Sequence, residues 1–300
     1  MSVSSNSKAV AAKGSPKRVR QGGEEEPTRT SNATAGLSPN EKGEVENKRP
    51  PKPAVLHEVI RREGEHELRR AVTALAFSSL AAGLSMGFSM VACALLHRYL
   101  GDLPGGSVIE SLGYSVGFLI VIIARQQLFS ENTMTAVLPL MSEPSWRKFG
   151  QLLRLWGVVL AGNLVGVAIY AYGLLHLEQF DAPTHESFRD LGKELMQNSP
   201  WQMFTKGILS GWLIATMVWM LAALEQSKLA IIIFMTTFVA LGGFPHIIVG
   251  SAESLYLVFS GELGWSGYVF DFALPTLAGN IVGGSFIFAL ISHAQVRSDR

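Results

Sequence analysis

Ionisable side chains are scarce in this sequence. Only 16% of its 300 residues are Asp, Glu, Lys or Arg, whereas soluble globular proteins carry about 25%. The net charge of +1 gives no support to nucleic-acid binding. With one cysteine, Cys93, the chain cannot form an intramolecular disulfide. Hydrophobic residues make up 48% of the chain and its mean hydropathy is +0.26, so the composition predicts a membrane protein.

Enzyme and cofactor motifs are also missing. The sequence has no P-loop, no dinucleotide-binding fingerprint and no zinc-ligand spacing. Residues 113–117 match G-x-S-x-G, but they lie within an apolar run and no strand precedes them. We therefore expect no enzymatic activity, no cofactor and no metal site.

The charged residues are concentrated at the N-terminus, where residues 1–70 hold 14 of the 25 Lys and Arg residues. Residues 1–53 are rich in Ser, Gly, Pro, Glu and Lys. Such a segment cannot bury enough apolar surface to offset its conformational entropy, so we expect a disordered polar cytoplasmic tail. Residues 54–70 have a helical pattern with Val55, Val59 and Leu68 apolar, which predicts an amphipathic helix at the membrane interface.

Long uncharged runs follow the interfacial segment. Each can cross a hydrocarbon core about 30 Å thick at ~1.5 Å per residue. Two further segments are apolar but interrupted by polar residues. We therefore expect six transmembrane helices within residues 71–294, with the second and fifth interrupted, and a short cytoplasmic tail over residues 295–300. The uninterrupted runs are 71–96, 155–175, 207–224 and 272–292, and the interruptions lie at 125–133 and 242–246.

The loops predict the orientation. With the N-terminus inside, six Lys and Arg residues join the basic tail on the inner side and three lie on the outer side, which is a positive-inside bias. We expect both termini in the cytoplasm and the chain in a bacterial inner membrane. The inner residues are Arg147, Lys148, Arg154, Lys228, Arg297 and Arg300, and the outer ones are Arg98, Arg189 and Lys193.

An internal repeat relates the two halves of the apolar region. A Gly-Asn-x-x-Gly box occurs in the third and sixth runs, 117 residues apart, and the breaks are related similarly, since Ser130 and His246 are 116 residues apart. Three spans followed by three equivalent spans must have opposite orientations, so the sequence predicts an inverted 3+3 repeat. We expect the box glycines and Asn163 to serve helix packing. The boxes are Gly162, Asn163 and Gly166, and Gly279, Asn280 and Gly283.

Interrupted helices inside a membrane have a physical cost. Each unpaired backbone group costs several kcal/mol in lipid, so a break persists only where protein buries it or where it lines an aqueous path. Two breaks at equivalent depths, each followed by a half-helix with a positive N-terminal dipole, form a site for a small anion.

The residues at both breaks resemble the formate/nitrite transporter family. The segment 128–133 resembles the broken second helix of that family, and 243–246 resembles the fifth-helix turn with its single pore histidine. The two Gly-Asn boxes and the segments 207–209 and 217–219 add to the match, which covers residues 58–294. The resemblance implies a homopentamer in which each protomer has its own aquaporin-like pore. It also implies small monovalent anions as substrates, such as formate, nitrite or hydrosulfide, some of them moved with a proton.

The resemblance also gives roles to pore residues. His246 would hand a proton to the anion, which then crosses an apolar constriction as a neutral acid; the alternative is a structural histidine that satisfies the unwound turn. Ser130 would bond the histidine or the substrate, or cap the following half-helix. Phe129 and Phe244 would shape constrictions or belong to the core, and Asn280 would be the polar partner of the histidine. Two further pore candidates are Leu128 and Thr133.

Four charged residues near the breaks depart from the family pattern: Arg125, Glu131, Lys206 and Glu253. Charges at membrane depth are costly and normally paired, so we expect Arg125 or Lys206 to pair with Glu131 or Glu253. The sequence leaves open whether these charges serve structure or selectivity. Gly211 stands where many family members have a second pore asparagine.

The predicted protein is thus an all-α channel or secondary transporter for a small monovalent anion, embedded in a lipid bilayer, in which the pore histidine His246 protonates the anion; the sequence leaves open whether it is a channel or a proton-coupled transporter. Two alternatives stay open. One is a pore for a neutral small solute, and the other is a transport-inactive membrane scaffold that recruits partners through its N-terminal tail.

Overall fold

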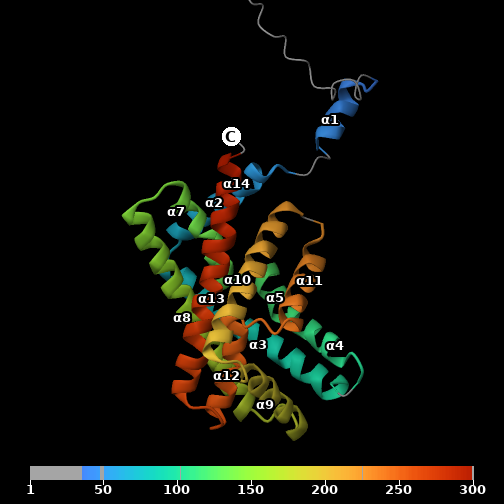
Figure 1. Ribbon diagram of the computed structural model, residues 1–300, viewed down its shortest axis with the longest axis vertical. Helices are drawn as coiled ribbons and strands as arrows, with labels where there is room; N and C mark the ends of the chain where they lie inside the picture. Colours follow the sequence, from blue (N-terminus) through green and yellow to red (C-terminus); the bar gives the residue numbers. More distant parts are fainter. Residues whose placement is uncertain (1–35, 48–50, 102, 225, 299–300) are drawn as a thin grey trace, which may run out of the picture. The chain divides into compact units, whose positions relative to one another are not determined.

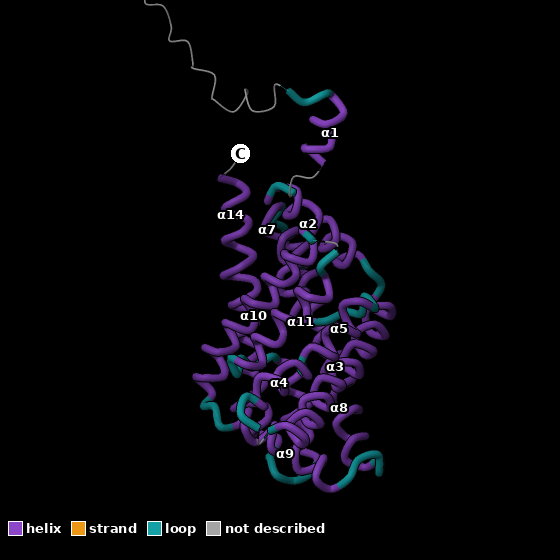
Figure 2. Tube along the Cα trace, turned by 90° about the vertical axis from the view of Figure 1, so that its right-hand side faces the viewer, coloured by secondary structure: helices purple, strands orange, loops and turns teal. Residues whose placement is uncertain are grey.

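A computed structural model describes residues 36–47, 51–101, 103–224 and 226–298. All regular elements among these residues are helices, with no strand among them (Figures 1 and 2). The chain divides into two units, Met1–Arg49 and Pro50–Arg300. The first unit contains α1 (Pro39–Asn47). The second contains α2 (Pro53–Arg69), α3 (Val72–Leu100), α4 (Gly106–Gly113), α5 (Ser115–Ile123), α6 (Phe129–Thr135), α7 (Val137–Ser142), α8 (Trp146–His176), α9 (Ala182–Met196), α10 (Pro200–Ala223), α11 (Lys228–Leu241), α12 (Ile247–Phe259), η1 (Gly267–Ala273), α13 (Leu274–Ile281), η2 (Val282–Ala289) and α14 (Leu290–Ser298).

Helix α1 lies inside the segment for which the sequence predicts disorder. Its start is a capping box: the Ser38 hydroxyl accepts the N–H of Glu41 at 3.3 Å, and the Glu41 carboxylate accepts the N–H of Ser38 at 2.7 Å. Pro39 occupies the first helical position, which suits proline. The structure therefore differs from the prediction over residues 39–47, and residues 1–35 and 48–50 of that prediction lie outside the described residues.

A helix is present over the predicted interfacial segment, but it buries a different face. Leu56, Ile60 and Leu68 of α2 are buried against the bundle, whereas Val55 and Val59 are each 52% exposed. Gly64 brings the two backbones together, because a side chain there would collide with the carbonyl group of Thr135. Helix α2 therefore docks on protein through the face that carries Leu56 and Ile60.

Ion pairs hold α2 to the beginning of α8. Lys148 donates to the carboxylates of Glu65 at 3.1 Å and Glu143 at 2.7 Å, and its hydrogen bond lowers the pKa of Glu65. Arg154 donates to the Leu68 carbonyl at 2.8 Å, which satisfies a carbonyl group at the end of α2. Most of these charged groups belong to the predicted inner side of the bundle.

Five helical segments among the described residues are long and apolar enough to cross a membrane. The predicted fifth span is not among them, because its break divides it into α11 and α12, two shorter apolar helices. The continuous helices extend beyond the apolar runs because their caps lie outside them. Ser145 caps α8, and Ser199 forms a capping box with Gln202 at the start of α10. The five segments are Val72–Leu100, Gly106–Ile123, Trp146–His176, Pro200–Ala223 and Gly267–Ser298.

Both predicted interruptions are present. The first break is shorter than the predicted 125–133: α5 ends at Ile123 and the helix resumes with α6 at Phe129. The second break matches the predicted 242–246, since α11 ends at Leu241 and α12 begins at Ile247.

The small residues of the two repeats let two helix pairs pack closely. A side chain at Gly83 of α3 or Gly166 of α8 would strike the backbone of the partner helix. The same holds for Gly211 of α10 against Asn280 and for Gly283 against the Ile208 carbonyl of α10. These close approaches lie where α3 meets α8 and where α10 meets the last helical segment, and the packing role of the box glycines stays a prediction.

Helix α9 was not expected from the sequence, although its start carries an ordinary signal. Asp181 caps it by accepting the N–H of Thr184, and Phe188 is buried. The helix packs on α12 (Figure 1). Its Arg189 and Lys193 bind the Glu262 carboxylate at 2.7 and 3.0 Å, and the Lys193 hydrogen bond lowers the pKa of Glu262.

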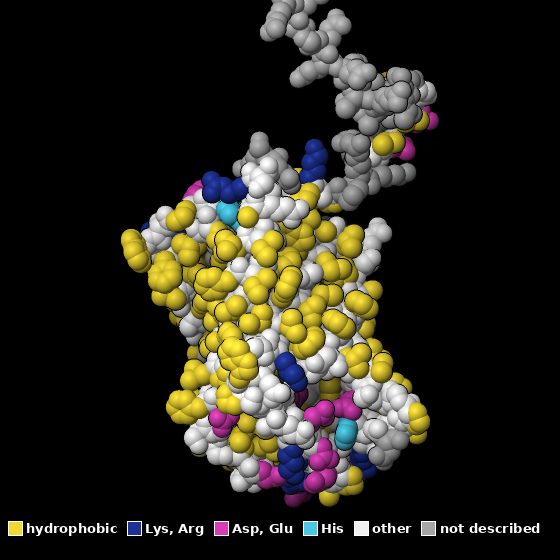
Figure 3. Space-filling view, in the orientation of Figure 1, with side chains coloured by type: hydrophobic (Ala, Val, Ile, Leu, Met, Phe, Trp, Pro, Cys, Tyr) yellow, Lys and Arg dark blue, Asp and Glu magenta, His cyan; other side chains and the backbone are white. Residues whose placement is uncertain are grey.

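The visible surface of the helical bundle is banded. Hydrophobic side chains cover its middle, and charged side chains gather toward the end that contains α9 and the end that contains α2 and α14 (Figure 3). The exposed large hydrophobic residues of the bundle include the aromatic residues Phe77, Phe234 and Phe286. Such a band is what contact with a hydrocarbon core or with neighbouring copies requires.

Candidate functional site

Both interrupted helices stop in the same way. Arg125 and Gly243 adopt left-handed backbone conformations with φ of 52° and 57°. The next amides then donate backward: Gln126 to the Val121 carbonyl at 2.9 Å and Phe244 to the Val239 carbonyl at 3.1 Å. These are the bonds of a Schellman motif. The three pairs of equivalent residues are each 118 positions apart: Arg125 and Gly243, Gln126 and Phe244, and Val121 and Val239.

Asn163 and Asn280 hold the two breaks in place with the same set of bonds. The Asn163 side chain accepts the N–H of Phe129 at 2.9 Å and donates to the carbonyls of Ser79 at 2.8 Å and Gln127 at 2.9 Å. The Asn280 side chain accepts the N–H of Ile247 at 3.0 Å and donates to the carbonyls of Gly207 at 2.9 Å and Pro245 at 3.1 Å.

Two sequence expectations change as a result. Asn163 does more than support helix contact, because it satisfies backbone groups that the first break leaves open. The expectation that Asn280 is the polar partner of the His246 side chain is wrong, because Asn280 instead bonds the backbone on both sides of His246.

The left-handed positions give a matched pair of stability predictions. Replacing Arg125 with Gly removes the steric cost of a side chain at φ 52° and should raise the free energy of unfolding by about 1 kcal/mol. Replacing Gly243 with Ala adds that steric cost at φ 57° and should lower the free energy of unfolding by about 1 kcal/mol or more. Thermal unfolding in detergent measures both. Changes of the opposite sign would show that side-chain contacts outweigh backbone strain at these turns.

His246 and Ser130 meet between the two breaks. His246 precedes the first residue of α12, and Ser130 lies in the first turn of α6. The His246 Nε2 atom is 2.7 Å from the Ser130 Oγ atom, and each residue is only 1% exposed. The ring of Phe118 packs edge-on against the imidazole at 5.2 Å. The two interruptions, 116 residues apart in sequence, are thus joined by one polar contact in the buried interior.

The bonds of His246 define its tautomer. Its Nδ1 atom accepts the backbone N–H of Val249 at 3.4 Å, so Nδ1 carries no proton. Nε2 then holds the ring proton and donates it to Ser130 Oγ. His246 is therefore both the cap of α12 and a hydrogen-bond donor toward the first break.

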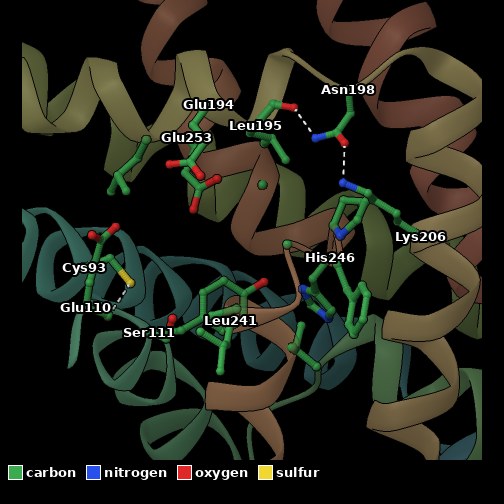
Figure 4. A pocket seen from close by; sticks show the side chains of 18 of the residues that line it. Cys93, Glu110, Ser111, Glu194, Leu195, Asn198, Lys206, Leu241, His246 and Glu253 are labelled. Atoms are coloured by element: carbon green, nitrogen blue, oxygen red, sulfur yellow. Dashed lines mark hydrogen bonds between the residues drawn. The ribbon is translucent and has the colours of Figure 1, made fainter. Parts of the chain in front are cut away.

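A cavity of about 500 Å³ opens on one side of His246. It lies among α4, α9, α10 and α12, with Phe244 and Pro245 of the second break in its wall. Four charged side chains line it together with the histidine: Glu110, Glu194, Lys206 and Glu253 (Figure 4). Three carboxyl groups and one amine make this a predominantly acidic cavity.

Not all predicted pore residues line this cavity. Phe129 and Leu128 are each 1% exposed, and the Phe129 ring packs edge-on against Trp156 at 5.8 Å. The Thr133 hydroxyl donates to the Ser130 carbonyl at 2.7 Å, within α6. These three residues are buried at the first break and do not line the cavity, whereas His246 and Phe244 do.

The predicted ion pairs across the breaks are wrong. Lys206 donates instead to the side chain of Asn198, in the loop between α9 and α10, at 2.7 Å. Arg125 is exposed on the protomer surface. Among the described residues, Glu131 and Glu253 form no ion pair or side-chain hydrogen bond.

The sequence analysis missed Glu110, Glu194 and Phe118. Glu110 is the one carboxylate in the apolar segment Gly106–Ile123. The predicted apolar run began at residue 111 and therefore excluded it. Glu194 lies on the unpredicted α9. Phe118 carries no polar group, and its contact with the histidine arises only when the two broken helices meet.

Comparison with known proteins places this geometry in context. The family described as formate/nitrite transporter matches residues 54–294. The chain is 52% identical over 254 residues to the inner membrane protein YfdC of Escherichia coli, covering 85% of this chain and 82% of that one. It is 21% identical over 277 residues to the E. coli formate channel FocA, covering 79% and 92% of the two chains.

Solved structures share the fold. A pentameric formate channel with formate bound superposes with a TM-score of 0.67 at 21% identity, covering 76% of this chain and 98% of that one. An FNT family ion channel gives a TM-score of 0.71 at 20% identity, covering 80% and 98%.

Proposed function

This chain belongs to the formate/nitrite transporter family, and from that premise we propose that it is a channel or secondary transporter for small monovalent anions of the formate and nitrite class. The observation that carries the proposal is the His246–Ser130 contact, which joins two interrupted helices beside a polar cavity that His246 lines. Interrupted backbone of this kind is retained where protein buries it or where it lines an aqueous path, and the second break contributes Phe244, Pro245 and His246 to the cavity wall.

The arrangement in the membrane is part of the proposal. The matched Asn163 and Asn280 bonds support an inverted repeat of three and three spans. The basic residues around α2 and α8 support an inner, cytoplasmic position for both termini. The exposed hydrophobic band and the name of the pentameric relative support a homopentamer in a bacterial inner membrane.

A proton is proposed to accompany the anion, because a neutral acid crosses a low-dielectric constriction at far lower cost than an ion. His246 is the polar group that the guest meets there, and its Nε2–H can donate a hydrogen bond. To give a proton away it must first hold two, and Nδ1 would then have to release the N–H of Val249.

Flux into proteoliposomes tests the proposal. Radiolabelled formate and nitrite should enter the vesicles. Entry should accelerate when the outer solution is made more acidic, because the higher proton concentration supplies the proton that accompanies the anion. Removal of residues 1–53 should leave the flux unchanged within about twofold. Entry of glycerol or urea without entry of any weak-acid anion would favour a pore for neutral solutes, and the absence of all flux would favour a scaffold.

A further inference from the structure

The cavity beside His246 lies on the proposed outer side of the membrane, and this outer cavity presents a difficulty for an anion. Its charged lining consists of Glu110, Glu194 and Glu253 against the single amine of Lys206, and that amine is already bonded to Asn198 at 2.7 Å (Figure 4). An anion that enters meets more negative than positive charge in surroundings of low dielectric, where such repulsion is strong. Either the guest or the lining has to change its protonation state.

Glu253 has a distinctive position among the three carboxyl groups. It lies on the same face of α12 as His246 and Gly250, since residues 246, 250 and 253 follow helical spacing and all line the cavity. Seven residues at ~1.5 Å each put it about 10 Å from His246 along the helix axis. A guest that moves from the mouth to His246 therefore passes Glu253.

The other two carboxyl groups are placed differently. Glu194 is exposed on α9 at the mouth, where solvent solvates its charge. Glu110 is bonded to the His97 ring at 2.9 Å. Glu253 is half-buried and has no hydrogen-bond or ion-pair partner among the described residues. An ionised carboxylate without a partner at membrane depth is costly, and its protonated form costs much less.

The groups around Glu253 reinforce this difference. From α9 it faces Glu194, from α4 Glu110, and both are acidic. Cys93 of α3 and Tyr114, which precedes α5, also line the cavity, and both side chains are neutral. Lys206 of α10 lines the same cavity with its amine held by Asn198, and His246 is engaged at both ring nitrogens. Helices α8 and α13 contribute no charged side chain to the described cavity lining.

We infer that Glu253 is the proton donor of the outer cavity: it carries a proton in the resting protein and transfers it to the entering weak-acid anion. The inference rests on the proposed function and deepens it. In the step, the O–H bond of the Glu253 carboxyl breaks and a new bond forms between that proton and the anion, which leaves Glu253 as a carboxylate and the guest as a neutral acid. A proton from the outer solution, entering past Glu194, restores the carboxyl.

This assignment explains why His246 can remain a neutral imidazole. The neutral acid reaches the constriction with its proton already in place, and Nε2–H of His246 needs only to donate a hydrogen bond to it. The bond from Val249 to Nδ1 is then kept throughout, so α12 retains its cap during transport.

The test compares full-length wild-type protein with Glu253→Gln in proteoliposomes, using formate as the probe and a trapped dye to report internal pH. Glutamine preserves shape but cannot release a proton. We expect formate uptake at acidic outer pH to fall at least tenfold, its rise with acidity to disappear, and the protons moved with each formate to decrease. Glu253→Asp, which keeps the carboxyl, should retain the wild-type dependence on pH at a reduced rate.

A matched control and an independent readout separate the outcomes. Glu178→Gln removes an exposed carboxyl outside the cavity and should leave uptake unchanged. Infrared spectra at neutral pH should show the stretching band of a protonated carboxyl that is absent in Glu253→Gln. A wild-type pH profile in Glu253→Gln, faster uptake caused by relief of repulsion, or absence of the band would overturn the inference while leaving the transporter intact. No anion flux in the wild type would instead overturn the proposed function.

Discussion

Replacing His246 with Phe is expected to lower anion flux about 100-fold. Phenylalanine fills similar space but removes both ring nitrogens, and so it removes the hydrogen-bond donor that meets the guest at the junction with Ser130. A single fixed donor in a water-excluded site is worth about 10²–10³ in rate. Radiolabelled formate uptake into proteoliposomes measures the loss, and a folded oligomer on size exclusion shows that the variant is intact.

The companion variant His246→Asn separates two roles of the histidine. Asparagine is a favourable N-cap and can replace the acceptor that Val249 N–H requires, and its amide keeps a donor near the junction. We expect flux within about tenfold of wild type and an unchanged number of protons per formate, because the proton comes from Glu253. If His246→Asn abolishes the proton that accompanies formate while Glu253→Gln does not, His246 is the donor.

Replacing Asn280 with Ala is expected to produce a large loss of stability. It leaves the N–H of Ile247 and the carbonyls of Gly207 and Pro245 without their partner. Each buried group left unsatisfied costs about 1–3 kcal/mol, so the variant should lose about 3 kcal/mol or more. Thermal unfolding in detergent, followed by circular dichroism, measures the change.

Two further variants calibrate that loss. Asn163→Ala should be destabilised to a similar extent, because Asn163 makes the equivalent three bonds at the first break. Asn198→Ala removes an amide that bonds Lys206 and the Leu195 carbonyl at the cavity wall, where water can replace it, so its effect should stay within about 0.5 kcal/mol. Equal stability of Asn280→Ala and Asn198→Ala would contradict the proposed anchoring of the break.

Several features of this fold could be predicted because they depend on local sequence. Apolar runs of sufficient length had to be transmembrane helices, and polar or glycine-rich interruptions such as 242–246 had to break them. The capping box at Ser38 and the N-cap at Asp181 are local signals of the same kind. The high overall polarity of the surrounding segments masks these signals in the sequence.

The partners of polar residues were harder to predict, and most expectations about them changed. Lys206 bonds Asn198 and not a carboxylate, and Asn280 bonds backbone groups and not the histidine ring. A side chain can reach several partners within a few ångströms, and small shifts of a helix decide among them. Hydropathy fixes neither the rotation of a helix nor the depth of a loop.

The sequence by itself determined the membrane class, the two helix breaks, the glycine boxes and the family, because each of these depends on the composition and the spacing of residues along the chain. Only the tertiary structure decided that Ser130 and His246 touch, that Phe118 packs on the imidazole, and that Glu253, Glu194 and Glu110 share one cavity. The physical reason is that these contacts join residues on different helices, and their distances depend on how whole helices pack, cross and tilt against one another.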